Sequence, residues 1–105
     1  MTLSRTNFDF MKQNPERRPK IVADNIRKIR EFRNYTQEYI AMKLNISQNA
    51  YSKLELGYSK ISIDRLFQIA ELLEVDAGEL VSYESAELLQ LFKSPLNRTM
   101  GQQRP

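Results

Sequence analysis

Hydrogen-bonding side chains gather on one face of the helix that the sequence predicts over residues 48–56: Gln48, Asn49, Ser52 and Lys53. A side-chain amide pairs bidentately with adenine N6 and N7, and lysine prefers guanine O6 and N7. The other side of this helix carries Ala50, Tyr51 and Leu54, which we expect to face a core. The polar face is therefore suited to reading base edges of nucleic acid. A solvated helix surface is the alternative interpretation.

The segments on either side of this helix predict how it is positioned. Thr36 is a good N-cap for a helix that runs to about Leu44. Asn45 tolerates positive φ, and Ser47 can cap the helix that follows. Because only residues 45–47 separate the two helices, the chain must turn sharply there, and Gly57 is a natural stop for the second of them.

Helical periodicity continues through the rest of the chain, and no strand pattern interrupts it. A helix from Lys20 should end near Asn34, and Ser62 can cap another that ends near residues 74–75. Asp76 and Glu79 resemble a capping box, which would start a short helix. The last apolar segment, over residues 86–92, would stop before Pro95. The sequence thus predicts an all-α protein.

Residues 1–19 are polar and irregular and contain Pro15 and Pro19, so we expect a flexible arm. The basic cluster Arg17, Arg18 and Lys20 suits contact with a nucleic-acid backbone or a minor groove. A disordered polar tail without such contacts is the alternative.

Composition excludes several classes of protein. The 105 residues include no Cys and no His, which removes disulfides, thiolate metal sites and the commonest general base. The acidic residues form no recognisable acid–base or metal-ligand arrangement, so we expect no enzyme, metal or cofactor. Neither an apolar run of about 20 residues nor a signal-peptide core is present, which predicts a cytoplasmic protein without a membrane segment.

The net charge of +3 is unevenly distributed. Residues 1–35 carry nine Lys/Arg against four Asp/Glu, residues 36–70 carry four against three, and residues 71–105 carry three against six. A basic front half suits a polyanionic partner, although charge also simply solvates surfaces.

Four stretches of the chain resemble the phage repressor and Cro family, also called the xenobiotic-response-element family of regulators: Thr36 to Ala41, Leu44 to Ser47, Tyr51 to Gly57 and Ile69 to Val75, with the later Leu80. The resemblance covers residues 21–81. Asn45 and Ile61 stand where the family usually has Gly and Pro. The resemblance implies a compact five-helix lambda-repressor-like DNA-binding domain over residues 20–82. The flexible arm, residues 1–19, would precede this domain, and a C-terminal helical extension and tail, residues 83–105, would follow it.

The resemblance also implies roles for particular residues. Gln48, Asn49 and Lys53 fall on base-contacting positions, and the residue pattern adds Ser52. Gln37 is expected to bind phosphate at a helix N-terminus, where exposed N–H groups favour an anion. The loop after the reading helix adds three phosphate candidates: Tyr58, Ser59 and Lys60. Arg30 and Glu55 are expected to form a structural ion pair rather than to read bases.

These features predict a sequence-specific regulator of transcription, acting as a repressor that binds an inverted repeat in double-stranded DNA as a homodimer. The candidate dimer surfaces are the helix after Asp76 and the apolar Leu88, Leu89, Leu91 and Phe92. Folding of that last segment onto its own domain is the alternative. A second functional hypothesis is an antitoxin or protein-interaction module that binds a protein partner through the arm or residues 83–105.

Overall fold

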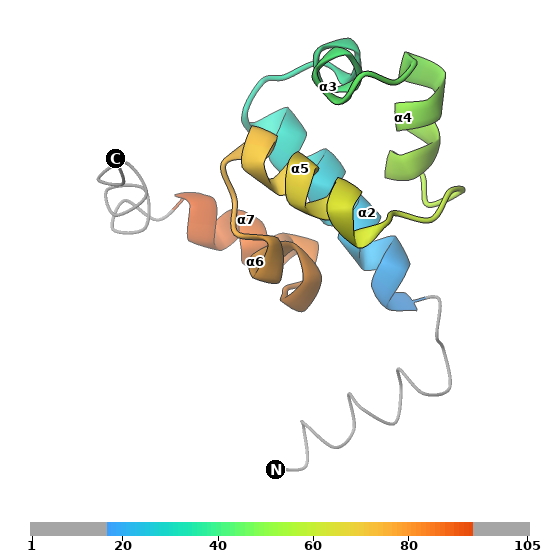
Figure 1. The fold of residues 1–105 in the computed structure, drawn as a ribbon. Coiled ribbons are helices and arrows are strands. Elements are labelled where there is room, and N and C mark those ends of the chain that lie inside the picture. The colour runs from blue at the N-terminus through green and yellow to red at the C-terminus, as the bar shows by residue number, and fades with distance from the viewer. Residues whose placement is uncertain (1–16, 94–105) are drawn as a thin grey trace.

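The computed structural model describes residues 17–93, and in that part of the chain all regular structure is α-helical (Figure 1). The helices are α2 (Arg17–Phe32), α3 (Gln37–Leu44), α4 (Gln48–Glu55), α5 (Ile63–Leu73), α6 (Ala77–Ser82) and α7 (Ser85–Lys93). The predicted all-α fold class is therefore confirmed. None of these helices is long and apolar enough to span a bilayer.

Three helices begin at the predicted hydroxyl caps. The side-chain oxygens of Thr36, Ser47 and Ser62 each accept the backbone N–H three residues further on, at 3.0 Å. Each cap satisfies one of the amide groups that a helix start leaves without a partner. The starts of α3, α4 and α5 are thus encoded locally.

Helices α2, α3, α4 and α5 each end beside a left-handed residue, and the sequence predicts all but one of these residues. Asn34, Asn45 and Gly57 have φ of 63°, 62° and 79°. Glu74, at φ 59°, is unexpected because this conformation costs a residue with a Cβ about 1–2 kcal/mol. Arg33 compensates, since its guanidinium donates to the carbonyl oxygens of Leu73 and Glu74 at 2.8 and 2.9 Å.

The start of the first helix differs from the prediction. α2 begins at Arg17 instead of Lys20, so residues 17–19 belong to a helix and not to the predicted arm. Arg17 pairs with Glu84 at 3.0 Å, which directs this cation toward its own domain. The rest of the predicted arm, residues 1–16, lies outside the described residues, as does the tail after Lys93.

The predicted capping box at α6 is wrong. Asp76 is the N-cap, but its side chain accepts no capping hydrogen bond. Its backbone carbonyl accepts the Glu79 N–H at 2.9 Å instead. One of the two hydrogen bonds of a capping box occurs at α7, where the Glu87 carboxylate accepts the Glu84 N–H at 3.1 Å.

One apolar core holds the six helices together, with α2 in contact with α4, α5, α6 and α7. In Figure 1, α3 and α4 lie at one end of the molecule and α6 and α7 at the other. The large apolar side chains that are almost completely buried come from every one of these helices: Ile26, Ile29, Ile40, Tyr51, Ile69, Leu73, Leu80 and Leu88.

Residues 85–93 fold back onto this core, which is the second of the two alternatives left by the sequence. Leu88 is completely buried, and Phe92 packs edge-on against Phe32 with ring centroids 5.7 Å apart. The Arg33 guanidinium lies over the Phe92 ring at 5.0 Å. Leu88 and Phe92 are therefore core residues, and residues 85–93 pack into the same core as the predicted 20–82 domain.

A buried asparagine fastens α7 and the end of α6 to α2. Asn25 is completely buried, and its Nδ2 donates to the carbonyl oxygens of Leu80 and Tyr83, each at 2.8 Å. The Ser85 hydroxyl lies within hydrogen-bond distance of Asn25 Oδ1 and of the Asp24 carboxylate. Because buried polar groups cost free energy when left unpaired, this arrangement favours one docking position for α7.

We expect the contribution of Asp24 to stability to depend on pH. Burial alone would raise the pKa of this carboxyl, but hydrogen bonds from Ser85 and Arg27 outweigh burial and lower the pKa below its usual value of 3.8. A carboxyl with a lowered folded-state pKa stabilises the protein above its unfolded-state pKa and loses that contribution as the pH falls through the folded-state value.

The test is urea unfolding of the wild type and of Asp24→Asn from about pH 7 to about pH 3. Near neutral pH the wild type should have a larger free energy of unfolding than Asp24→Asn, by a difference that does not change with pH. This difference should shrink below about pH 4. Ser85→Ala, which removes one of the hydrogen bonds, should show a smaller pH dependence than the wild type. A margin that is independent of pH would contradict this assignment.

Candidate nucleic-acid interface

Helix α4 has one buried side and one outward side. Tyr51 and Glu55 are 0% and 4% exposed, and Leu54 is also buried. The predicted base-reading residues lie on the remaining surface, with Gln48, Asn49 and Lys53 exposed and Ser52 half-buried. Ala50 differs from the prediction, because it is exposed and does not face the core.

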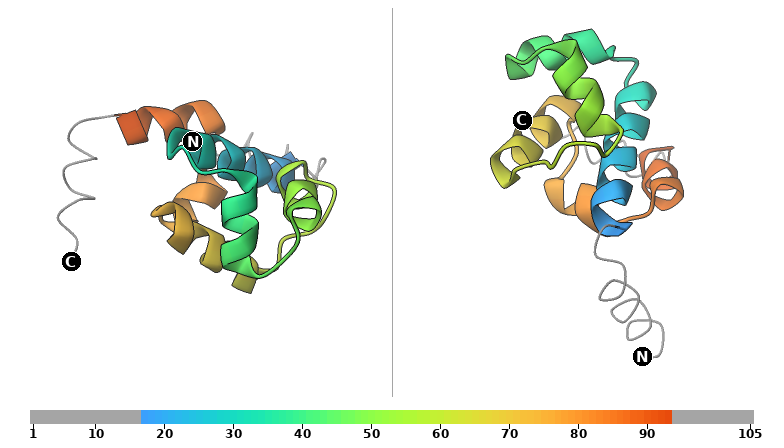
Figure 2. Two further views of the ribbon diagram at one scale, coloured as in Figure 1. Left: turned by 90° about the horizontal axis from the view of Figure 1, so that it is seen from above. Right: turned by 90° about the vertical axis from the view of Figure 1, so that its right-hand side faces the viewer.

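The connection between α3 and α4 places the starts of both helices on a shared surface. The Asn45 and Ile46 N–H groups donate to the carbonyl oxygens of Met42 and Ala41, each at 3.0 Å, which closes α3 in a tight turn. Gln48 Nε2 then lies 3.5 Å from Gln37 Oε1. The residue predicted to bind phosphate and the first residue predicted to read a base are therefore neighbours, and Figure 2 shows the two helices side by side.

Arg30 and Glu55 lie in contact beneath this surface. Arg30 Nε donates to Glu55 Oε2 at 2.6 Å and Nη2 donates to Oε1 at 3.2 Å, while Nη1 donates to the Tyr35 carbonyl oxygen at 2.7 Å. The Glu55 side chain has no exposed surface and that of Arg30 is 11% exposed. This bidentate pair joins α2 to α4 and so fixes the position of the candidate reading helix.

The pair also sets the electrostatics around α4. Burial alone would lower the pKa of Arg30, but the hydrogen bonds and the charge of Glu55 raise it above its usual value. Burial and the neighbouring Glu55 carboxylate raise the pKa of the Tyr51 hydroxyl. Tyr51 therefore stays neutral, and the charges beneath the surface are those of the ion pair.

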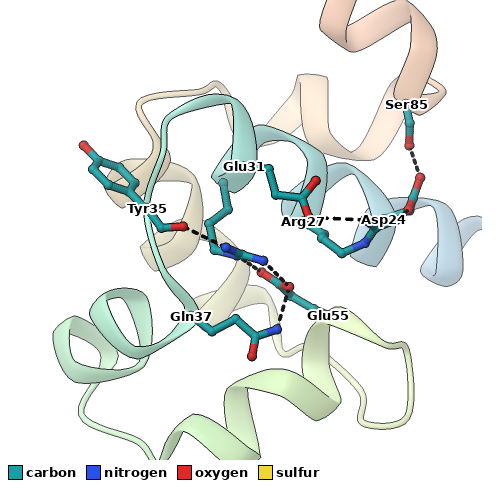
Figure 3. A network of polar contacts seen from close by, with 8 residues as sticks. Asp24, Arg27, Glu31, Tyr35, Gln37, Glu55 and Ser85 are labelled. Atoms are coloured by element: carbon teal, nitrogen blue, oxygen red, sulfur yellow. Dashed lines mark hydrogen bonds and ion pairs between the residues drawn. The ribbon is translucent and has the colours of Figure 1, made fainter.

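Sequence reasoning missed the position of Gln37 relative to this pair. Its Nε2 donates to Glu55 Oε1 at 3.1 Å (Figure 3). Because its Oε1 lies 3.5 Å from Gln48 Nε2, the amide lies between the buried carboxylate and Gln48. No local pattern links these two residues, which are 18 positions apart. The contact exists only because α3 packs against α4 while α4 packs against α2.

The loop after α4 and the start of α5 border an open hollow of about 640 Å³ beside the reading helix. Four of the predicted contact residues line it: Asn49, Lys53, Ser59 and Lys60. Arg65, which sequence reasoning did not single out, also lines it and donates to the Leu44 carbonyl oxygen at 3.2 Å. Tyr58 lies outside this lining and is 79% exposed. The charged groups of the hollow are all cationic, which favours an anion there.

Residues 26–80 match the helix-turn-helix family, and the chain belongs to that family. This match confirms the resemblance to the phage repressor and Cro type of regulator. The family consists of DNA-binding regulators of transcription and not of enzymes.

Two relatives from Bacillus subtilis strain 168 bear names that fit this class. The uncharacterized HTH-type transcriptional regulator YqaE is 34% identical over 65 residues, which are 62% of this chain and 56% of the relative. The HTH-type transcriptional regulator AnsR is 30% identical over 61 residues, which are 58% of this chain and 53% of the relative. The chain thus spans about half the length of these relatives. No solved structure matches it.

Proposed function

We propose that this regulator binds double-stranded DNA sequence-specifically by placing α4 in the major groove, and that it acts as a repressor. The observation that carries the proposal is the division of α4 into a buried side, which contains the Glu55 ion pair, and an outward side of amides and a lysine. A major groove is wide enough for one helix, and its base edges differ for every base pair.

The outward side chains have the chemistry that base reading needs. Gln48 and Asn49 each offer a donor and an acceptor, which match adenine N6 and N7, and Lys53 offers donors that match guanine O6 and N7. Ser52 is half-buried between them, and its short hydroxyl can serve bases of either kind. Because the Arg30–Glu55 pair joins α4 to α2, the helix that carries these groups is positioned before DNA binds.

Phosphate contacts on both sides of the groove would position the reading helix. Gln37 stands in the first turn of α3, where the helix dipole favours an anion. Lys60, with Ser59, reaches the other side from the loop after α4, and the exposed Tyr58 lies beside them. Such contacts carry no sequence information but supply much of the affinity.

Binding as a homodimer to an inverted repeat would supply the specificity that one helix lacks, with half-sites about 34 Å apart. Because Leu88 and Phe92 are buried in the core of their own subunit, we place the dimer surface elsewhere. We propose the exposed apolar side chains of α5 and α6, namely Ile63, Phe67 and Val81.

Selection of bound fragments from a random DNA pool tests the proposal. We expect an inverted-repeat motif for the wild type. Gln48→Ala and Asn49→Ala should each cost about 1–3 kcal/mol of binding free energy and relax the motif only at their own positions. Lys60→Ala should weaken binding to all sequences evenly and reduce the salt slope by about 1.

Gln90→Ala is the matched control, because Gln90 is an exposed amide on α7 and not on the reading helix. This variant should enrich the wild-type motif. A wild-type protein that enriches no motif would contradict sequence-specific binding, and a single unrepeated half-site would contradict the dimer.

The alternative function, an antitoxin or interaction module that binds a protein through residues 83–105, gains no support from the described part of that segment. Leu88 and Phe92, the buried side chains of α7, are covered by its own domain. Specific DNA binding therefore remains the function that we propose.

A further inference from the structure

Cations without acidic partners gather around the open hollow beside α4. Its lining includes Lys53, Lys60 and Arg65, and no acidic residue of the described chain lines it. None of these three cations forms an ion pair with a described carboxylate, whereas Arg27 and Arg30 of α2 have carboxylate partners at 2.7 and 2.6 Å. Because like charges held close together repel one another, an anion that enters the hollow stabilises this cluster.

Arg65 is held at the hollow with one edge of its guanidinium unused. Its Nη1 donates to the Leu44 carbonyl oxygen at 3.2 Å and to Gln68 Oε1 at 3.0 Å. Its Nε and Nη2 donate to no group in the described part of the chain. These are the two atoms through which Arg30 binds the Glu55 carboxylate, and the same planar fork matches two oxygens of a phosphate. Arg65 can therefore bind a phosphate bidentately and keep the contacts that hold it in place.

The rest of the lining suits a ligand larger than a single phosphate group. The hollow measures about 640 Å³, and sites for small molecules usually measure about 300–1,000 Å³. Ile46, Ala50 and Leu54 supply an aliphatic surface, and Asn49 adds an amide with one donating and one accepting end. A phosphate alone would leave the aliphatic surface uncovered. A nucleotide also carries a flat base that can cover this surface, with edge atoms that can pair with the amide.

We infer that the hollow is a binding site for free nucleotides, and that a bound nucleotide competes with DNA for α4. The competition rests on the proposed function, because Asn49 and Lys60 would then serve both ligands. Duplex DNA presents the same phosphate chemistry, but its bases are paired and stacked. Only a free nucleotide can place a base against Ile46 and Leu54. DNA binding would thus respond to the concentration of a small phosphorylated compound.

An NMR titration without DNA tests the site directly. The probes are adenosine triphosphate with a metal chelator, inorganic tripolyphosphate and adenosine, all at one ionic strength. Adenosine triphosphate should shift the backbone amide signals of Ala50, Ser59 and Arg65. It should bind at least about tenfold more tightly than tripolyphosphate, which has a similar charge but no base. Adenosine, which has no phosphate, should bind more weakly than adenosine triphosphate by at least as much.

Two variants distinguish this site from a general attraction between the protein and anions. Arg65→Gln removes the guanidinium fork, and Ala50→Glu places a carboxylate among the cations at an exposed position of α4. Each should weaken the binding of adenosine triphosphate by about tenfold. Lys93→Gln is the matched control, because it removes one positive charge from an exposed position on α7 and should bind the nucleotide as the wild type does. If Arg65→Gln does not fold, Ala50→Glu carries the test alone.

A second measurement adds duplex DNA. Adenosine triphosphate should raise the apparent Kd of the wild type and of Lys93→Gln for DNA, and tripolyphosphate at the same ionic strength should raise it less. Equal binding of adenosine triphosphate and tripolyphosphate, or wild-type nucleotide binding by both variants, would overturn the inference. Nucleotide binding that leaves the affinity for DNA unchanged would overturn the competition. A protein that selects a DNA motif but binds no nucleotide would lose this site and keep the proposed function, whereas nucleotide binding without a selected motif would show the reverse.

Discussion

Arg30→Met is expected to lower the free energy of unfolding by about 3–5 kcal/mol at neutral pH. The substitution keeps much of the apolar volume of the arginine stem but removes both hydrogen bonds to Glu55 and the bond to the Tyr35 carbonyl oxygen. The Glu55 side chain has no exposed surface, so water cannot replace the lost guanidinium. Only the Gln37 amide would remain within hydrogen-bond distance of the carboxylate, as a neutral donor.

Urea denaturation of the wild type and of Arg30→Met, followed by circular dichroism, measures this loss. The control is the double variant Arg30→Met with Glu55→Leu, which removes both charges and should recover a large part of the stability, because an apolar pair often replaces a buried ion pair without loss. A single variant within about 1 kcal/mol of the wild type would show that the carboxylate finds water or another donor.

Leu88→Ala is expected to destabilise the protein by about 2–5 kcal/mol, the cost of deleting a large side chain from a packed core. Leu88 is completely buried, and the asparagine at position 25 holds the start of its helix in place, so the site cannot easily collapse around the cavity. The result would establish α7 as part of the DNA-binding domain's own core.

The measurement pairs urea unfolding with sedimentation equilibrium of the folded protein. The variant should lose stability while its self-association stays at the wild-type level, because the side chain lies inside one subunit. Leu89→Ala serves as a control on the same helix, and its half-buried position should make the loss smaller. A loss of self-association with little change in stability would instead place Leu88 between two subunits.

The parts of the fold that the sequence predicts are those that neighbouring residues determine. Thr36, Ser47 and Ser62 each cap a helix through an amide three residues away, and Asn45 closes the turn before α4 within its own segment. These signals lie within a few positions of the structure they produce, so they can be read directly from the chain.

The packing of α7 could not be predicted in this way. Its apolar side chains fit either a subunit interface or the protein's own core, and the choice depends on what the preceding helices leave uncovered. Asn25 illustrates the difficulty, because it looks like an ordinary polar residue of α2. The carbonyl oxygens that justify its burial belong to residues 55 and 58 positions further along the chain.

The candidate site also has parts that the sequence predicts and parts that it does not. Helical spacing predicts that Gln48, Asn49 and Lys53 face outward from one helix, and all three are exposed. The pairing of Arg30 with Glu55 came from the family resemblance, because residue types alone do not reveal which charges meet across 25 positions. Neither the residue types nor the family resemblance predicts the contact between Gln37 and Glu55, which arises only when the helices pack together.

The separation of α4 into an anchored underside and an outward side has a consequence for how regulators of this kind diversify. Tyr51 and Leu54 face the interior, whereas Asn49 and Lys53 do not contribute to the buried core. Substitutions at Asn49 and Lys53 would therefore change the recognised operator with little loss of folding stability. Duplicated genes can acquire new targets by such substitutions. Gln48 is linked to the interior through Gln37, so we expect this position to change more slowly than the other base-reading positions.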